Sequence, residues 1–391
     1  MGKLDKLIAE LCPDGVEIKN LSQVLTIKNG KEYKGFGKGD VPVYGTGGVM
    51  AYIDHAAYEK PSVLIPRKGS LDKLYYVDVP FWTVDTIFYT DIRTEMVEPK
   101  YVYYYLQAQH LEKLNTAGGV PSLTQTVLKT IKIPLPPLPI QQEIVRILDN
   151  FTELTAELTA ELTARKKQYE YYRDELFGRD YDGMLKRAEE KNTQIVAMEE
   201  LGNFTRGKRF VRNDIREEGV PCIHYGDLYT HYGVSAEKTK CFLDEDLSKK
   251  MRFAQRGDVV IVQAGENDMD IGIGVAWMGN EDVAVHDACY IFKHNINPKY
   301  ISHYLRTSIY HLQIKKYVSI GKICAINAQG IGKALIPIPP LEEQARIVAI
   351  LDRFDTLCND LTSGIPAEIE ARRKQYEYYR DKLLTFKEAN L

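Results

Sequence analysis

Two glycine-containing stretches of this 391-residue chain hold the side chains best suited to contact with a polyanion. They read "IKNGKEYKGFGKG" and "TRGKRFVRND", and glycine allows a close backbone approach in each. Lysine and arginine bind phosphates, and arginine also reads base edges. A run of charges is equally typical of a solvated face, but two runs at matching places favour nucleic acid. The candidate contacts are Lys28, Lys31 and Lys34 in the first stretch and Arg206, Lys208, Arg209 and Arg212 in the second.

A second group of candidates follows apolar strands or borders a final turn. Arg67 and Lys68 come directly after "SVLIP", and a bidentate contact to guanine needs such an arginine. Gln263 and Asn267 fall at about the same place in a later region and are a pair suited to adenine. Three lysines around the last turn of that region suit phosphates, namely Lys315, Lys316 and Lys322.

Motifs for catalysis are missing from the sequence. It has no G-x-x-x-x-G-K-[ST] phosphate loop, no dinucleotide-binding glycine pattern and no N-P-P-Y-like methyltransferase motif. "PDG" at 13 to 15 and "EYK" at 32 to 34 have the residue types of a metal-dependent nuclease, but "PDG" is an ordinary turn signal. The six cysteines show no paired spacing. We therefore predict neither a catalytic site nor a metal site.

Composition is typical of a multidomain chain without a global charge signal. A length of 391 residues predicts two or three domains. The 51 basic and 54 acidic residues nearly balance, so any basic surface must be local. No run of about 18 apolar residues occurs, and charges stand where a signal peptide has its apolar stretch. We expect a soluble, cytoplasmic protein that does not bind a membrane.

The elements that must position the candidate residues occur twice. "IPLPPLPIQQEIVRILDNF" at 133 to 151 returns as "IPIPPLEEQARIVAILDRF" at 336 to 354, and "KQYEYYRD" recurs unchanged at 167 to 174 and 374 to 381. The prolines form an extended lead-in, because each lacks an amide donor and restricts the residue before it. Apolar residues then recur in steps of three or four over about ten turns, which predicts a long helix packed along a partner helix.

The two predicted helices differ in the middle. The first contains "TELTAELTAELTA" at 152 to 164, built from a four-residue unit that can lengthen a helix without losing its apolar seam. The second has "LTSGIPAEIEA" instead, and Gly364 with Pro366 predicts a kink or a break there.

Short β-branched and aromatic runs in residues 18 to 133 predict the strands of a mixed domain, followed by a helix at 99 to 115. Residues 195 to 335 resemble them in the same order. The expected fold class is α+β, with two α/β domains separated by two long antiparallel helices that form a coiled coil with internal pseudo-two-fold symmetry. The expected segments are a first domain at 1–135, a helical region at 136–178, a linker at 179–194, a second domain at 195–335 and a second helical region at 336–391.

With this organisation, the sequence resembles the specificity subunits of type I restriction-modification systems over essentially its whole length. The resemblance is carried by the duplicated P-P-L, Q, I-V and I-L-D-x-F opening, by the "RKKQYEYYRD" close, and by the "TAEL" units, which are similar to the spacer of one subgroup. It implies a non-catalytic subunit with two target-recognition domains. Each domain would read one half of a bipartite site in double-stranded DNA, and the helices would set the spacer.

The resemblance also implies partners. Two methyltransferase subunits would bind the outer faces of the helices, and two motor-nuclease subunits would join them for cleavage. These partners would bind S-adenosylmethionine, Mg and ATP, so no cofactor is expected in this chain. We expect Tyr169, Tyr172, Tyr376 and Tyr379 to fill the helical seam. Tyr and Arg are enriched at interface hot spots, and the candidates for partner contacts are Tyr171, Arg173, Tyr378 and Arg380.

Two rival functions are weighed against this one. A nuclease acting alone has only the "PDG" and "EYK" residues in its favour. A coiled-coil scaffold that binds proteins through both globular domains is compatible with the nearly neutral charge. Salt-sensitive binding of the complex to DNA would separate the scaffold from a DNA-reading subunit, because phosphate contacts release counterions.

Overall fold

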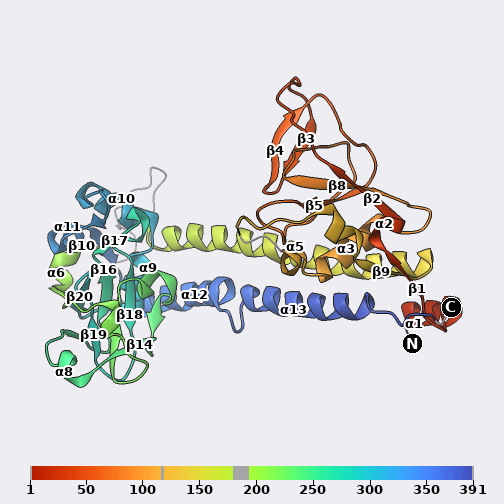
Figure 1. Ribbon diagram of the computed structural model, residues 1–391. Coiled ribbons are helices and arrows are strands. Elements are labelled where there is room, and N and C mark those ends of the chain that lie inside the picture. Colours follow the sequence, from red (N-terminus) through yellow and green to blue (C-terminus); the bar gives the residue numbers. More distant parts are fainter. Residues whose placement is uncertain (1, 116–118, 179–192, 390–391) are drawn as a thin grey trace. The chain divides into compact units, whose positions relative to one another are not determined.

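The computed structural model describes residues 2–115, 119–178 and 193–389. The chain forms two compact units, one made of Met1–Glu157 with Ile369–Leu391 and the other of Leu158–Glu368. Each unit holds one globular domain and a pair of long-helix segments (Figure 1). Among the described helices, none combines the length and apolar character that a membrane span needs.

Two small sheets form the globular part of the first unit. The strand order is β2-β8-β5-β6 in one sheet and β4-β3-β7 in the other. Every residue of β5 is buried, and α3 packs against β5 and β6. The predicted helix at 99 to 115 is divided, because His110 adopts a left-handed conformation with φ of 50° between α3 and the 3-10 turn η1. The bounds are α1 Lys3–Leu11, β2 Leu25–Asn29, β3 Val41–Gly45, β4 Gly48–Ile53, β5 Ser62–Pro66, β6 Tyr75–Val77, β7 Trp82–Thr83, β8 Ile87–Ile92, α3 Pro99–Ala108 and η1 Leu111–Leu114.

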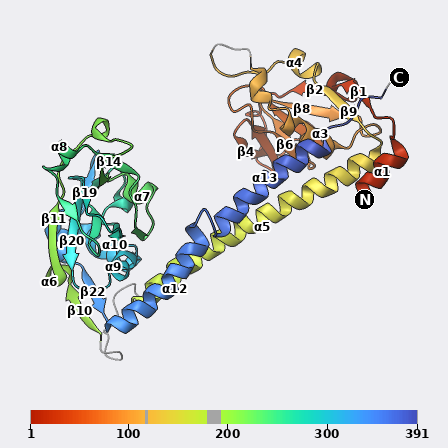
Figure 2. The same cartoon turned by 90° about the horizontal axis from the view of Figure 1, so that it is seen from below.

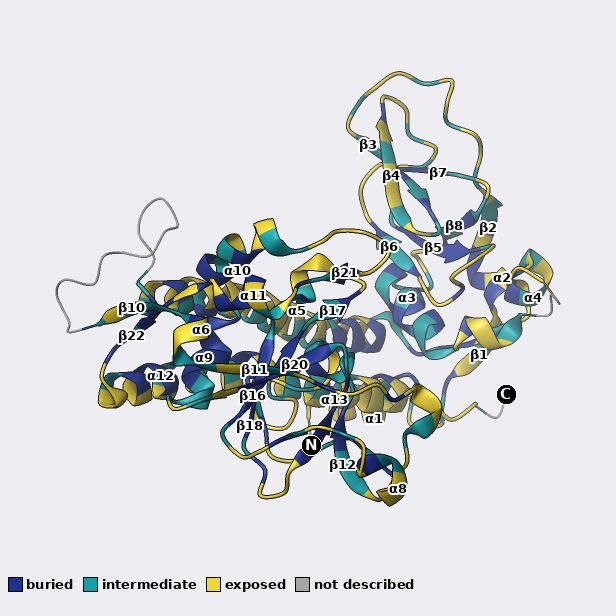
Figure 3. Cartoon of the chain, turned by 90° about the vertical axis from the view of Figure 1, so that its left-hand side faces the viewer, coloured by how far each residue is buried: buried dark blue, intermediate teal, exposed yellow. Residues whose placement is uncertain are grey.

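The second unit repeats this plan with additions. Its sheets have the orders β11-β20-β16-β18-β13 and β14-β12-β19-β15. Strands β16, β18 and β19 are buried along their whole length, and Figure 3 shows β16 and β18 in the dark colour of buried residues. The bounds are β11 Gly202–Arg206, β12 Val220–Ile223, α7 Asp227–Thr230, β13 Ser235–Ala236, β14 Cys241–Leu243, α8 Glu245–Ser248, β15 Phe253–Ala254, β16 Val259–Val262, β17 Ala264–Gly265, η3 Asp268–Asp270, β18 Gly274–Trp277, β19 Val283–Val285, β20 Cys289–His294, α9 Pro298–Tyr304, α10 Ser308–Ile314 and β21 Cys324–Ala325.

The duplication predicted from the sequence is confirmed at the level of single strand pairs. In each unit the proline lead-in pairs antiparallel with the first strand of the domain, with Ile18 opposite Pro134 and Ile195 opposite Pro337. A proline fits a two-stranded ribbon because its missing amide can face away from the partner. The flanking short helices repeat too. The bounds are β1 Glu17–Asn20, α2 Leu21–Val24, α4 Gln125–Lys129, β9 Lys132–Leu135, β10 Gln194–Ala197, α6 Met198–Leu201, α11 Ala328–Gly332 and β22 Leu335–Ile338.

The long helices form as the sequence predicts, one continuous and one broken. Helix α5, Leu138–Leu176, has 39 residues and begins directly after the prolines. The second copy is divided into α12, Leu341–Asn359, and α13, Ile365–Leu383. Gly364 lies against the carbonyl oxygens of Thr356 and Asp360, where a Cβ would clash. Pro366 stands in the first turn of α13, where no amide donor is needed. The expected kink or break is therefore a break.

The seam is closed separately within each unit (Figure 2). In the second unit, Phe354 of α12 stacks on Tyr169 and Tyr172 of α5, with ring centroids 6.0 and 5.7 Å apart. In the first unit, Phe151 of α5 stacks on Tyr379 of α13 at 5.6 Å. The expectation for the tyrosines needs one correction. Tyr172 and Tyr379 lie at the edge of the seam, 41% and 37% exposed.

The sequence reasoning missed the path of the C-terminal residues. After α13 the chain returns to the first unit, where the Val16 amide donates to the Lys387 carbonyl and the Ala389 amide donates to the Val16 carbonyl, at 2.9 and 3.0 Å. Leu384 is buried in the same core. Of the predicted linker at 179–194, residues 179–192 lie outside the described residues, and Gln194 already begins β10.

Candidate nucleic-acid interface

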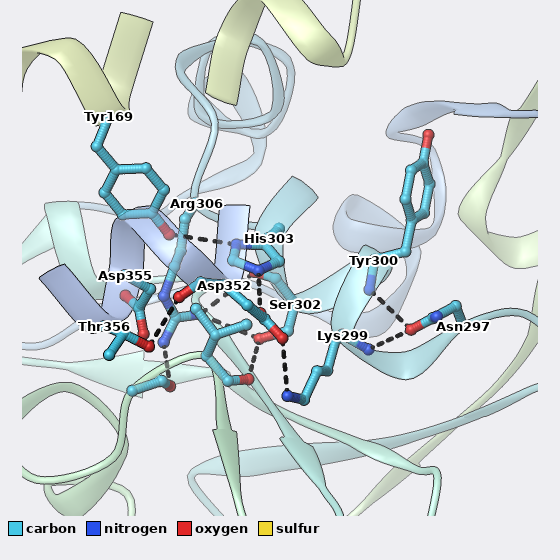
Figure 4. A network of polar contacts seen from close by, with 12 residues as sticks. Tyr169, Asn297, Lys299, Tyr300, Ser302, His303, Arg306, Asp352, Asp355 and Thr356 are labelled. Atoms are coloured by element: carbon cyan, nitrogen blue, oxygen red, sulfur yellow. Dashed lines mark hydrogen bonds and ion pairs between the residues drawn. The ribbon is translucent and has the colours of Figure 1, made fainter. Parts of the chain in front are cut away.

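The repeated aspartate of the I-L-D-x-F motif anchors each domain to its long helix. In the second unit, Asp352 accepts from Lys299 Nζ and His303 Nε2, both at 2.9 Å, and Tyr169 donates to His303 Nδ1 at 3.3 Å (Figure 4). Asp149 repeats this arrangement in the first unit. It accepts from Lys100 Nζ at 2.8 Å and from the Tyr104 hydroxyl at 2.5 Å. The motif therefore fixes the direction in which each domain leaves its helix.

The repeated glutamine closes the same joint. Gln141 is fully buried, its Oε1 accepts from the Glu98 amide at 2.8 Å, and its Nε2 donates to the Pro136 carbonyl at 2.7 Å. Gln344 makes the equivalent bonds to the Asn297 amide and the Pro339 carbonyl. Each glutamine satisfies backbone groups at a helix start and at the proline lead-in, which would otherwise be buried without partners.

The two basic stretches occupy equivalent places in the two domains. The Lys31 amide donates to the Thr83 carbonyl at 2.8 Å, and the Lys208 amide donates to the Val285 carbonyl at 2.9 Å. The glycines before them, Gly30 and Gly207, lie so close to the next carbonyls that a Cβ would clash. The close approach expected of the glycines is therefore made to the chain itself. It fixes where each basic stretch leaves its strand.

Arg67 and Gln263 are equivalent in the same strict sense. The Arg67 amide donates to the Thr86 carbonyl, and its carbonyl accepts from the Leu123 amide, both at 2.9 Å. The Gln263 amide donates to the Ala288 carbonyl at 2.8 Å, and its carbonyl accepts from Ile326 at 2.9 Å. Both residues follow a fully buried strand. The positional match between Arg67 and Gln263 that the sequence indicated is confirmed.

The candidate lysines of the first domain fall into two groups, those that form an ion pair with an acidic side chain and those that do not. Lys28 is already paired, because its ammonium lies 3.0 Å from Asp91 and 5.5 Å from the Tyr58 ring centroid, so its contact with DNA stays a prediction. Hydrogen bonds from Tyr58 and then Lys28 keep the pKa of Asp91 below its ordinary value. Lys31, Lys34 and Lys68 are exposed, and their side chains make no ion pair within the described part of the chain.

A groove beside these lysines adds residues that the sequence reasoning did not select. It has a volume of about 760 Å³ and is lined by Lys34, by Thr86 and by the turn between β3 and β4. Directly after that turn, β4 carries two consecutive exposed apolar residues, Val49 and Met50, the latter 57% exposed. The signal was available in "GTGGVM", because adjacent apolar residues after a glycine turn cannot both face a core. Arg67 reaches the Asp85 carbonyl, at 3.4 Å, at this edge.

In the second domain the basic stretch is only partly available. The Arg206 guanidinium is held by Asp287, with Nε donating to its carbonyl at 2.7 Å. Lys208, Arg209 and Arg212 are exposed, and none of them forms an ion pair in the residues described. Phe210, between them, is buried and its carbonyl lies 3.0 Å from His286 Nε2.

Histidines lie beneath this loop. The His224 and His286 rings are 4.8 Å apart, and burial and then the neighbouring His224 lower the pKa of His286. Burial therefore favours the neutral form of both rings, while the Asp287 carboxylate lies 3.4 Å from His286 Nδ1.

The remaining candidates of the second domain are distributed over other features. Asn267 caps η3, accepting from the Met269 amide at 3.2 Å. Lys316 lies over the Tyr317 ring at 5.0 Å, and Lys322 is exposed. Lys315 lines a separate groove of about 840 Å³ that also includes Tyr171 and Arg173 of α5. The structure therefore groups Lys315 with a predicted partner surface rather than with Lys208.

The residues predicted for partner contacts also divide. Tyr171 and Tyr378 point away from the seam and are 58% and 62% exposed. Arg380 is a correction, since it is only 9% exposed, lies over the Tyr376 ring at 5.7 Å and bonds Asp381 at 2.8 Å. Arg173 likewise lies over Tyr169, at 5.3 Å, and is half-buried. Each arginine stacks on the seam tyrosine four residues before it, so the two are structural equivalents.

Across the described residues, no group of three or more His, Cys, Asp or Glu side chains is arranged to hold a metal ion. The Cys222 and Cys241 thiols lie 3.5 Å apart on paired strands, but both are buried.

Comparisons with known proteins agree with this arrangement. The family model described as "Type I restriction modification DNA specificity domain" matches residues 13–165 and 190–371. The specificity subunit of the Escherichia coli type I restriction enzyme EcoR124I/EcoR124II is 35% identical over 298 residues, which is 73% of this chain and 70% of that protein. A Haemophilus influenzae protein assigned as a type I restriction enzyme specificity subunit is 30% identical over 402 residues, covering 95% and 96% of the two chains.

Solved structures share the fold. The S subunit of a type I restriction-modification system from M. genitalium superposes with a TM-score of 0.55 at 16% identity, covering 94% of this chain and 96% of that one. A chain from a study of complex assembly and conformational transition of the type I R-M system gives 0.61 at 16% identity, with 97% and 99% covered.

Proposed function

Because the chain belongs to the family of type I restriction-modification DNA specificity proteins, we propose that it is the DNA-reading subunit of such a complex. Each globular domain reads one half of a bipartite target, and the helices set the distance between the halves. The chain supplies recognition, and the chemistry belongs to its partners.

The observation that carries this proposal is the repeated edge. Both domains hold a lysine and a base-reading type of side chain on one short segment, Lys31 with Arg67 on residues 83–86 and Lys208 with Gln263 on residues 285–288. The backbone bonds are the same, whereas the side chains and the adjoining turns differ. A shared scaffold with different side chains is what two different half-sites require.

The partners follow from the helices. We propose that two methyltransferase subunits bind this chain, one to each half, through surfaces that include Tyr171 and Tyr378, and that motor-nuclease subunits join them for cleavage. Tyrosines with large exposed rings are typical anchors of protein interfaces. S-adenosylmethionine, Mg and ATP would be held by those subunits, which leaves this chain without a cofactor of its own.

The test compares the methylated bases in the genomes of two cell lines. One carries this chain together with its methyltransferase, and the other carries the methyltransferase alone. We expect a bipartite adenine motif with a fixed gap in the first line only. If the complex assembles and no new methylation is found, the result supports the scaffold function and overturns the DNA-reading function.

A second readout separates the same two functions in vitro. Binding of the purified complex to a duplex with the motif should weaken steeply between about 50 and 200 mM salt, because each phosphate contact releases counterions. A scaffold would show no salt-sensitive preference for that duplex over a scrambled one.

A further inference from the structure

Arg67 and Gln263 occupy equivalent positions in the two domains, and equivalent hydrogen bonds hold the backbone at both positions. Each residue has its amide and its carbonyl bonded on opposite sides, as described above, and each follows a strand with no exposed residue. A side chain that starts from a fixed backbone reaches a defined volume. The two domains therefore offer the same approach to a ligand with two different functional groups.

Gln263 carries a polar atom that the described chain does not satisfy. Its Oε1 is buried and has no hydrogen-bond partner among the described residues. An unpaired buried acceptor is destabilising, because the desolvation of the atom is not offset by a hydrogen bond. A ligand that brings a donor to this amide would relieve that cost. Adenine presents a donor at N6 beside an acceptor at N7, which is the pattern that a carboxamide pairs with.

Arg67 offers a different pattern from the same position. Its Nη1 donates to the Asp85 carbonyl at 3.4 Å, and its guanidinium lies 5.9 Å from the Phe88 ring centroid. Asp85 lies just before β8 and Phe88 lies within it, so the guanidinium is oriented by the scaffold. An arginine presents parallel donors, which match O6 and N7 of guanine.

The backbone of a lysine is held next to each of these residues. The Lys31 amide bonds Thr83 and the Arg67 amide bonds Thr86, three residues along one segment. The Lys208 and Gln263 amides bond Val285 and Ala288 at the same spacing. Each segment contains a tight turn, in which the Ile87 amide donates to the Val84 carbonyl and the Cys289 amide to the His286 carbonyl, at 3.2 and 3.0 Å, so the two held residues lie close together. A lysine that contacts the DNA backbone and a side chain that contacts a base edge can therefore act together.

We propose that Arg67 and Gln263 are matched specificity residues, with Arg67 reading a guanine in one half-site and Gln263 an adenine in the other. Lys31 and Lys208 hold the neighbouring phosphates. The proposal rests on the proposed function, and it identifies the residue in each domain that determines which base is recognised.

The test uses the full complex with its methyltransferase and a panel of duplexes that carry single base changes in the motif. Relative affinities are measured by competition within one sample, so a partly misfolded variant still gives a valid ratio. For Gln263→Ala we expect the preference for adenine at one position of one half-site to fall about 5- to 150-fold, which corresponds to about 1–3 kcal/mol. All other positions should keep their ratios.

The exchange variants test the pairing of the two residues. Gln263→Arg should move the preference at that position from adenine to guanine, and Arg67→Gln should make the reverse change in the other half-site only. Gln329→Arg is the matched control, because Gln329 is exposed on α11 of the same unit and adds the same charge elsewhere.

The outcomes are distinguishable from a failure of the proposed function. If the unaltered complex has no bipartite preference, the proposed function itself is wrong. If the unaltered complex has one and Gln263→Ala lowers affinity for every duplex equally, Gln263 contacts the backbone and the specificity proposal is overturned. An unchanged motif in both exchange variants overturns it too.

Discussion

Asp352 shows how a single motif residue can hold a domain in place. Burial raises the pKa of Asp352, but the hydrogen bonds from His303 and Lys299 outweigh burial, so the pKa lies below its ordinary value. The carboxylate therefore stays charged at neutral pH and remains bonded to α9. The same anchor in the first unit uses Tyr104 where the second uses His303. The sequence could show that the aspartate repeats, but not what it contacts, because its partners lie on a helix remote in sequence.

The candidate contacts show the same limit at the scale of single residues. The sequence could place Arg67 and Gln263 at equivalent positions, because the strands before them are recognisable apolar runs. It could not distinguish Lys28 from Lys31, since that difference depends on Asp91, which lies diagonally across from Lys28 on a strand distant in sequence. Arg380 was expected to face a partner, but its stacking on Tyr376 depends on how α13 rotates in its unit.

His294 makes the second unit sensitive to acid. Burial lowers the pKa of His294 to about 4, while its Nδ1 accepts from the Ile296 amide at 3.3 Å. An unfolded chain binds a proton near pH 6.5, so between these pH values the unfolded state binds more protons than the folded state. The stabilising contribution is therefore complete above pH 6.5 and is lost as the pH falls towards 4.

We predict that His294→Phe reduces this acid sensitivity by on the order of 2 kcal/mol. The free energy of unfolding of the full chain is measured with denaturant at pH 7 and near pH 4.5. The wild-type value should fall more than that of the variant, although His311, whose pKa is also lowered to about 4 by burial, remains in both. The same substitution at exposed His231 is the control. An equal fall for His294→Phe and wild type would contradict the prediction.

Helix α5 and the pair α12 and α13 are two outcomes of one duplicated element. The apolar steps predicted both helices, and Gly364 with Pro366 predicted the interruption, because these residues act locally on the backbone. The sequence could not predict which side chains pack across the seam. It depends on which rings meet. Phe354 stacks on Tyr169 and Tyr172, whereas among the described residues of the seam Phe151 stacks only on Tyr379.

The "TAEL" units lead to a prediction about the length of α5. Deleting residues 155 to 158 removes about 6 Å of helix and leaves a residual rotation of about 40°, so the seam residues stay close to their register. We expect the spacer of the recognised motif to shorten by about one or two base pairs, given about 3.4 Å of rise per base pair. Both half-sites should remain unchanged, and the methylated motif is the readout.

The reciprocal insertion of one such unit is the control for this deletion. It should lengthen the spacer by the same amount. Helices α12 and α13 are separated by a break, so they do not form one continuous helix that would oppose a change in the length of α5. A changed half-site in either variant would count against the helix as the element that sets the spacer.

At the scale of the whole molecule, the duplication was visible because it preserves short, distinctive strings. The prolines, glutamine and aspartate around Gln141 and Gln344 recur for a physical reason, since they form the joint between each domain and its helix. The additions to the second domain were not visible as such. Helix α10 and the long connection between β12 and β14 have no counterpart string in the first domain. The return of Lys387 and Ala389 to the first unit depends on a pairing with Val16 across nearly the whole chain.

The independence of the two domains gives the last prediction. Each domain has its own core and is joined to the long helices by an anchor that both units repeat, to which the second unit adds hydrogen bonds from Ser308 to Asp174. Replacing residues 195 to 335 by the corresponding domain of a relative should therefore change one half-site and leave the other half-site and the spacer as they were. The joint residues Asn297, Lys299 and His303 lie inside the exchanged segment and Gln344 and Asp352 outside it, so a donor domain must supply an equivalent amide and cation.

The methylated motif of cells carrying the chimera is the measurement. An exchange of residues 99 to 108 alone is the control, because α3 contributes to the joint of the first unit without the edge that holds Arg67. That control should leave both half-sites unaltered. A chimera in which both half-sites change would mean that the domains read DNA jointly, and the modular account would then be wrong.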